Sequence, residues 1–174
     1  MEQFIHEGGR VNMTLVFSQE QAAAVHAATR RAKKGDVFVS PFIGRLDDIG
    51  ENGMDLIKNI RKMYDEASSH VEVLAASIRS TEHFLASLMY RADILTAPAK
   101  AIRSWASSLP SPLPEGGVWG VGAPEGFVYD RKELKPIPYR TLDLSKGWRE
   151  YNISHPLTDR GIERFAADWN ALIQ

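Results

Sequence analysis

The stretch VFVSPFIGRLDD, residues 37–48, carries the strongest fold signal in this 174-residue chain. Its first six residues are apolar or small and rich in valine, which is typical of a buried strand. The polar loop IGRLDDIGENG follows over 43–53, and a helix is expected over 54–68 because apolar residues recur there at helical spacing. Strand, loop and helix together predict one β/α unit.

The same order of strand and helix is found on both sides of this unit. Before it, a strand is expected over 10–17 and a helix over 19–34, and Ser18 and Gln21 have the spacing of a capping box. After it, strands and helices continue to alternate: strands 71–78 and 94–98, helices 81–91 and 101–108. Such alternation implies a parallel sheet with right-handed crossovers. The predicted fold class is therefore α/β, with about four parallel β/α units.

The composition changes after residue 109. Residues 110–157 hold most of the prolines and many of the glycines, which predicts a long arm with at most short strands. A final helix is expected over 158–172, and its apolar residues share one face: Ile162, Phe165, Ala166, Trp169 and Leu172. An apolar face of this kind calls for a packing partner.

Composition also excludes several classes of function. The formal net charge is −1 and the pI is near 6.5, with scattered lysines and arginines, so nucleic acid is not an expected partner. The chain has no cysteine, which excludes disulfides and thiolate chemistry. No stretch approaches the roughly 20 apolar residues that span a bilayer, so no membrane is expected and the cytoplasm is the default location. Neither a cofactor nor a metal is expected, since the histidines lack HxH or HExxH spacing: His6, His26, His70, His83 and His155.

Polar residues recur near the ends of three expected strands. Residues two apart in a strand share a face, and the carboxyl ends of parallel strands are where α/β proteins bind ligands. The pairs are Asn12 with Thr14, Ser40 with Phe42, and Ser77 with Arg79. The alternative for each is a solvated edge, a local bond to backbone or a surface arginine. Because the pattern occurs three times, we favour a binding site.

The loop over 43–53 also carries charges. Its carboxylates, Asp47, Asp48 and Glu51, precede a helix, where acidic residues favour the helix dipole and serve as caps. We interpret them as structural, with Asp47 as a lesser candidate for holding Arg45.

Five segments, "VNMTLVFS", "FVSPFIGRLDD", "VLAASIR", "DILTAP" and "LTDRGIERFAADW", in that order and spacing, resemble the transaldolase family, which includes the fructose-6-phosphate aldolases. The resemblance covers about residues 10–105 and 155–172. It implies a (β/α)8 TIM barrel in which a lysine on the fourth strand forms a Schiff base with a ketose phosphate. The implied reaction transfers a dihydroxyacetone unit between sugar phosphates, as in the pentose phosphate pathway.

The resemblance also implies roles for single residues. Asn12 resembles the family's asparagine that touches the bound sugar, and Thr14 resembles the threonine that orients the catalytic water. Ser40 and Phe42 are similar to sixth-strand positions, where phenylalanine is typical of the transaldolase branch and tyrosine of the aldolase branch.

A phosphate clamp is implied at Arg45, Ser77 and Arg79. A guanidinium group suits this role, because it offers two donors in fixed geometry to phosphate oxygens. The sequence therefore predicts that Arg45, in the opening stretch, holds the phosphate of a sugar phosphate.

The chain departs from the family in length. A full barrel needs about 250 residues, and we expect only a partial barrel like strands five to eight: a half barrel over 1–109, a Pro/Gly-rich arm over 110–157 and a helix over 158–174 packed on the barrel. The family's first four strands, with the Schiff-base lysine, have no counterpart. Lys100 is a weak substitute, because lysines at helix starts are usually solvated.

Two functions stay open at this point. The first is a transaldolase-type enzyme that needs the missing N-terminal strands. The second is an inactive, truncated remnant that binds sugar phosphate or only self-associates. The expected partners are a sugar phosphate and either further copies of the chain or a complementing N-terminal half chain, and the chain by itself is expected to be inactive.

Overall fold

The computed structural model describes residues 2–107 and 123–173 and has an α/β fold. Four strands pair in parallel in the order β1-β2-β3-β4: β1 (Val11–Val16), β2 (Val37–Pro41), β3 (Glu72–Ala75) and β4 (Ile94–Leu95). The helices are α1 (Glu2–His6), α2 (Gln19–Ala28), α3 (Ile43–Asp47), α4 (Gly53–Glu66), α5 (Thr81–Met89), α6 (Ala99–Ser107) and α7 (Pro156–Leu172), with a 3-10 turn at Trp148–Glu150. The predicted α/β class with about four parallel β/α units is confirmed, and the sheet is consistent with a partial TIM barrel.

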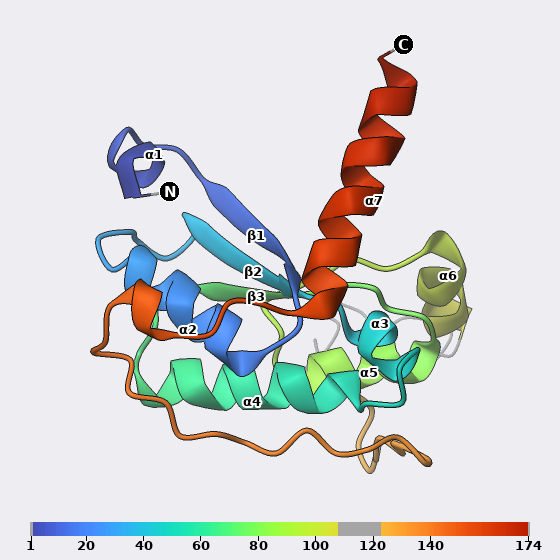
Figure 1. Ribbon diagram of the computed structural model, residues 1–174. Helices are drawn as coiled ribbons and strands as arrows, with labels where there is room; N and C mark the ends of the chain where they lie inside the picture. The colour runs from blue at the N-terminus through green and yellow to red at the C-terminus, as the bar shows by residue number, and fades with distance from the viewer. Residues whose placement is uncertain (1, 108–122, 174) are drawn as a thin grey trace, which may run out of the picture.

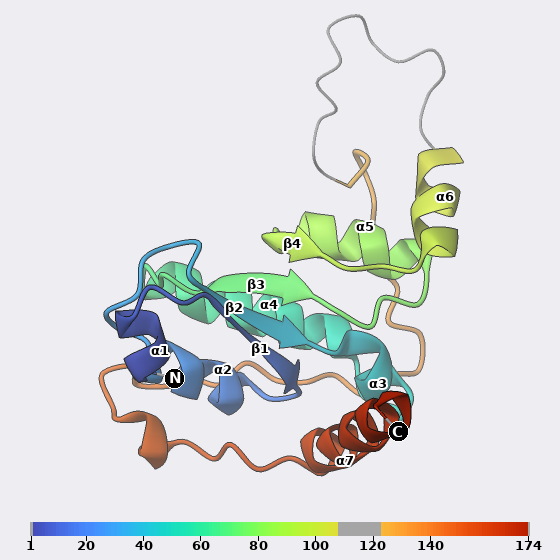
Figure 2. The same ribbon diagram turned by 90° about the horizontal axis from the view of Figure 1, so that it is seen from above.

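Helices α2 and α4 cover one face of the sheet (Figures 1 and 2). Valines at alternate strand positions pack against these helices, and Val37, Val39 and Val73 are fully buried. The capping box at the start of α2 forms as predicted: the Ser18 hydroxyl accepts from the backbone N–H of Gln21, and the Gln21 carboxamide accepts from the backbone N–H of Ser18. Helix α2 ends at Ala28, because Thr29 leaves helical geometry, and does not reach the predicted residue 34.

Residues 43–53 were expected to be a loop, and that expectation was wrong for the first half. Ile43–Asp47 form the short helix α3, in which Ile43 and Leu46 are fully buried. The backbone N–H groups of Ile43 and Gly44 bond to the carbonyls of Ala76 and Ser77. A helix this short shows no helical period in the sequence. Tertiary hydrogen bonds and burial stabilise it.

Two non-glycine residues at the carboxyl end of the sheet have positive φ angles. Leu15 has φ of 58° where the pairing of β1 with β2 shifts register, and Ser77 has φ of 59° just after β3. Such backbone is uncommon outside glycine and tends to occur at functional sites. The strand expected over 71–78 therefore ends at Ala75, and its last residues form a strained turn.

The arm and the final helix run along the outside of this unit. From the arm, Arg140 and Gln19 exchange two hydrogen bonds, and Asn59 donates to the carbonyl of Ile137, so the arm is fastened to α2 and α4. Residues 110–122 of the expected arm lie outside the described residues. Helix α7 contacts the end of β1 with its first turns and then projects from the body, as Figure 1 shows. Within the described ranges 2–107 and 123–173, no helix is long and apolar enough to cross a membrane.

Candidate functional site

The first two predicted site residues meet across neighbouring strands. Ser40, near the end of β2, donates a hydrogen bond from its hydroxyl to Oδ1 of Asn12 on β1, at 2.7 Å. Ser40 is buried, whereas Asn12 and Thr14 are exposed. The hydrogen bond holds the Asn12 carboxamide by its oxygen, which leaves the amide N–H groups available to an acceptor on the open side of the sheet.

Arg45 contacts two aromatic rings. Its Cζ atom is 5.3 Å from the centre of the Phe42 ring and 5.6 Å from the centre of the Phe165 ring, which belongs to α7. Both distances are within the range of a cation–π contact. In the part of the chain that the structure describes, no carboxylate forms an ion pair with Arg45.

Arg79 is held differently. Its Nη2 atom forms an ion pair with Oδ2 of Asp48 at 2.8 Å, and both side chains are about half exposed, at 52% and 57%. Its Nε atom donates to the Ser77 hydroxyl at 3.5 Å, which is a long hydrogen bond. Ser77 and Arg79 do lie together, but not because they share a strand face, since β3 ends at Ala75.

Gly44 joins the two segments that carry these arginines. Its N–H donates to the Ser77 carbonyl at 3.1 Å. A Cβ atom at position 44 would lie 2.4 Å from the Ser77 carbonyl oxygen and 2.6 Å from Cγ of Arg79, too close for any side chain. A glycine is therefore needed for α3 to approach the turn after β3. In the sequence Gly44 looks like an ordinary loop glycine, and no local pattern predicts its role.

His83 and Asp47 add a second link between the same segments. Oδ2 of Asp47 lies 2.8 Å from Nε2 of His83, and Oδ1 of Asp47 accepts from the backbone N–H of Gly53 at 2.9 Å. The backbone N–H of Arg79 donates to Nδ1 of His83 at 3.4 Å, so this pattern puts the imidazole proton on Nε2, facing the carboxylate.

The suggestion that Asp47 holds Arg45 was wrong. Asp47 serves the start of α4 and His83, and it is Asp48 that pairs with an arginine, Arg79. Because the Asp47 carboxylate caps a helix N–H, the structural interpretation of this residue is confirmed. Histidine spacing in the sequence does not predict the link between His83 and Asp47, because α5 and α3, which carry them, meet only in the folded chain.

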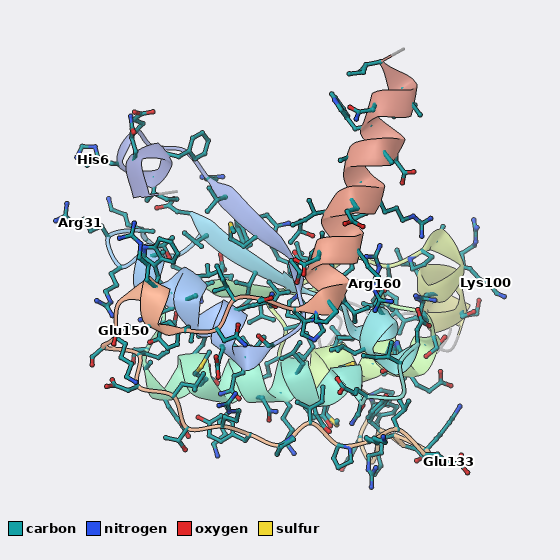
Figure 3. The ribbon with its side chains drawn as sticks, viewed as in Figure 1. His6, Arg31, Lys100, Glu133, Glu150 and Arg160 are labelled. Carbon is teal, nitrogen blue, oxygen red and sulfur yellow. The ribbon has the colours of Figure 1, made fainter. Side chains whose placement is uncertain are left out.

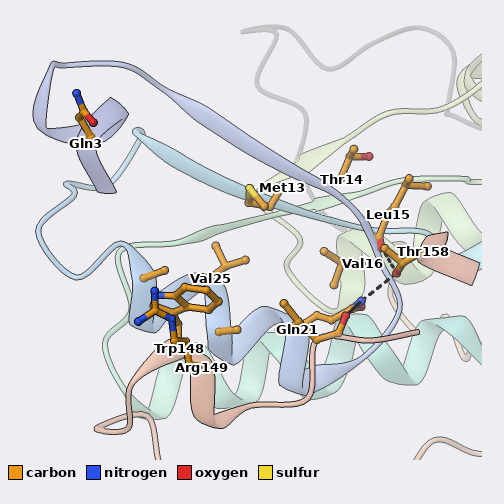
Figure 4. A pocket seen from close by; sticks show the side chains of 13 residues that line it. Gln3, Met13, Thr14, Leu15, Val16, Gln21, Val25, Trp148, Arg149 and Thr158 are labelled. Carbon is orange, nitrogen blue, oxygen red and sulfur yellow. Dashed lines mark hydrogen bonds between the residues drawn. The ribbon is translucent and has the colours of Figure 1, made fainter. Parts of the chain in front are cut away.

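A cavity of about 530 Å³ lies beside β1, on the side of α2. Figure 4 shows Met13 and Val16 of β1 on one side and Val25 and Trp148 on the other, and Thr14 is also among the lining residues. The lining is mostly apolar and includes neither Arg45 nor Arg79. This cavity is therefore separate from the predicted phosphate clamp.

All the lysines of the chain lie in its described residues, and all of them are exposed. A Schiff-base lysine must be desolvated and directed into a pocket. Lys100, labelled in Figure 3, is exposed at the start of α6, and the remaining lysines of the chain are exposed as well: Lys33, Lys34, Lys58, Lys62, Lys132, Lys135 and Lys146. The geometry gives no support to Lys100 as a substitute nucleophile.

Comparison with known proteins supplies the family. The family model described as transaldolase/fructose-6-phosphate aldolase matches residues 1–174. Relatives named "Probable transaldolase" include one from Ruegeria sp., 46% identical over 165 residues, and one from Brucella ovis, 36% identical over 163 residues. These alignments cover 94–95% of this chain but only 51–52% of each relative, so the chain spans about half the length of the relatives it matches. The chain belongs to the transaldolase/fructose-6-phosphate aldolase family.

Proposed function

We propose that this chain supplies the phosphate-binding part of a transaldolase-type site, in which Arg45, Ser77 and Arg79 hold the phosphate of a sugar phosphate. The observation that carries the proposal is the environment of Arg45. Its Cζ atom lies over the rings of Phe42 and Phe165, and no described carboxylate forms an ion pair with it. Stacking leaves the N–H edge of a guanidinium open, and that edge suits the oxygens of a phosphate.

The surroundings of Arg79 support the same proposal. The guanidinium of Arg79 already bonds one oxyanion, the Asp48 carboxylate, at 2.8 Å. A phosphate would replace this carboxylate or share Arg79 with it, and the Ser77 hydroxyl would add one donor. The link from Gly44 to Ser77 keeps the segments of Arg45 and Arg79 together, so one ligand between them is feasible.

The remaining residues would face the sugar. Asn12, oriented by Ser40, would donate to a sugar hydroxyl, and Thr14 would orient the water that acts in Schiff-base hydrolysis. Phe42 favours the transaldolase branch of the family. The reaction would transfer a dihydroxyacetone unit between sugar phosphates of the pentose phosphate pathway, a role in keeping with the cytoplasm.

We further propose that the 174-residue chain does not catalyse this reaction alone. A Schiff base needs a desolvated lysine, and each lysine here is exposed. The nucleophile would have to come from further strands, either in another segment or in a separate chain. The second candidate function is phosphate binding or self-association without catalysis, which the same exposed lysines favour for the chain on its own.

Titration with inorganic phosphate tests the clamp. In ¹⁵N-resolved NMR spectra, the Nε–Hε signals of Arg45 and Arg79 should shift together and saturate. Loss of one charge-assisted contact of about 1.5–3 kcal/mol should weaken binding by roughly ten-fold or more in Arg79→Ala. Arg103→Ala is the matched control, because Arg103 is exposed on α6. Arg61 would be a poor control, since it pairs with Asp65 and Asp93 and its side chain is only 17% exposed.

The proposal fails if phosphate moves neither arginine signal, or if Arg79→Ala and Arg103→Ala bind phosphate as tightly as the unchanged chain does.

A further inference from the structure

We infer that Phe165, on the final helix α7, is a positioning residue for Arg45 and thereby sets the affinity of the phosphate site. The inference rests on the proposed function, in which Arg45 binds the phosphate. Phe165 itself would not touch the ligand; it would act through the guanidinium that it covers.

The contact between the two residues has a defined geometry. Cζ of Arg45 lies 5.6 Å from the Phe165 ring centre, and the Phe42 ring lies at 5.3 Å. A guanidinium that contacts two rings gives up both contacts when it rotates away, so fewer conformations compete with the one that presents its N–H edge. The Phe165 side chain is 42% exposed, so it contributes little to the core.

Gly161, one turn before Phe165, makes room for this arrangement. A Cβ atom at position 161 would lie 3.0 Å from Nη1 of Arg45 and 2.7 Å from Cδ2 of Leu15. Gly161 is one of the few buried residues of α7. The helix can therefore come close to Arg45 at this position because no side chain intervenes, and Phe165 then reaches the guanidinium from the next turn.

The base of α7 is fixed to the same end of the sheet. The Thr158 hydroxyl donates to the Leu15 carbonyl at 2.9 Å and accepts from Nε2 of Gln21 at 2.9 Å. Leu157 is buried beside them. One face of α7 carries Thr158, Gly161 and Phe165 at helical spacing. Because Thr158 is bonded to Leu15 at the strained end of β1, that contact fixes the base of the helix and with it the position of Phe165. Helix α7 thus forms a wall of the phosphate site.

A matched set of variants tests this inference. Phe165→Leu removes the ring but keeps an apolar side chain, whereas Phe165→Tyr keeps a ring. Trp169→Leu removes a different ring, one turn further along α7, from a residue that is 63% exposed. A cation–π contact at an exposed site is worth a factor of about two to five in a binding constant. We expect Phe165→Leu to weaken inorganic phosphate binding by that factor, while Phe165→Tyr and Trp169→Leu bind as the unchanged chain does.

Spectra recorded without phosphate separate this inference from the proposed function. The ring current of Phe165 displaces the Nε–Hε signal of Arg45, so Phe165→Leu should move that signal and Trp169→Leu should leave it in place. If phosphate does not bind at all, the proposed function fails, and the phosphate-free spectra alone decide whether Phe165 positions Arg45. The inference is overturned if those spectra do not distinguish the two variants, or if phosphate binds and both variants weaken it equally.

Discussion

Helices α4 and α7 carry similar apolar stripes but lie in opposite environments. In α4, Ile57 and Ile60 are 0% exposed and Tyr64 is 2% exposed, because the helix packs against β3, α2 and α5. In α7, Phe165 is 42% exposed and Trp169 63% exposed, because the helix leaves the body after its first turns (Figure 1). Helical spacing thus identifies the face that a helix will bury, whereas the surrounding elements decide whether it is buried within the chain.

The difference also separates stability from recognition. Burial of α4 contributes to folding in proportion to the apolar area removed from water, about 25 cal/mol per Å². The stripe of α7 contributes little of this kind, and one of its residues instead contacts Arg45 of the candidate site. Changes in the two helices should therefore have separable effects.

The largest expected effect is on stability. Ile60→Ala should lower the free energy of unfolding by about 2–4 kcal/mol, since it deletes fully buried methyl groups from a packed core. Trp169→Ala should change it by less than about 0.5 kcal/mol. Urea unfolding followed by circular dichroism measures both values. Equal losses in the two variants would mean that α7 is part of the core in solution.

The second effect is on association. The exposed stripe of α7 and the position of β1 at the edge of the sheet predict a dimer or larger assembly at micromolar concentration. Trp169→Glu, which puts a charge on the stripe, should lower the average mass measured by light scattering, at most to the mass of the monomer. Asn170→Glu adds the same charge beside the stripe and should leave the mass unchanged. If the unchanged chain is a monodisperse monomer at this concentration, the prediction is wrong.

Much of this comparison could be drawn from the sequence. The order of β/α units, the capping box of Ser18 and Gln21, and the polar positions at the ends of β1 and β2 follow from local patterns. Three features could not be predicted: the short helix α3, the positive φ of Ser77, and the pair of Asp47 with His83. Each depends on contact between two segments that are distant in the sequence and meet at the carboxyl end of the sheet. Such a contact cannot be predicted from a local stretch of residues.

The third effect concerns pH and the opposite end of α2. Burial lowers the pKa of His26 to about 4 from its usual 6.5, with help from His70 and Arg30. The unfolded chain therefore binds a proton at His26 that the folded chain does not, and stability should fall as the pH drops from about 6.5 towards 4. The pKa of His70 is also lowered by burial and acts in the same direction.

The variant His26→Gln isolates this contribution. Its free energy of unfolding should decrease less over this pH range than that of the unchanged chain. The two decreases should differ by on the order of 1–2 kcal/mol after allowance for the partly exposed ring. Urea titrations at pH 7, 6, 5 and 4.5 give the slope. An unchanged slope would mean that His26 titrates alike in both states.

The smallest effect is at the ion pair of Arg79. Asp48→Asn should leave stability within about 0.5 kcal/mol, because exposed ion pairs contribute little. It should, however, strengthen phosphate binding by about two- to five-fold, since a competing carboxylate is removed and an exposed charge pair is worth under about 1 kcal/mol. Glu133→Gln, an exposed change of the same charge in the arm, is the control. Weaker binding in Asp48→Asn would mean that the carboxylate orients Arg79 and does not compete.

We propose that this chain can hold a sugar phosphate but cannot form a Schiff base with it. Borohydride reduction in the presence of fructose 6-phosphate, followed by mass spectrometry, tests this most directly, because reduction traps an imine as a stable adduct on the lysine. We expect no adduct on any lysine of the folded chain, whereas a transaldolase relative treated in parallel should be labelled. A stoichiometric adduct on a lysine of this chain, at Lys100 above all, would contradict it.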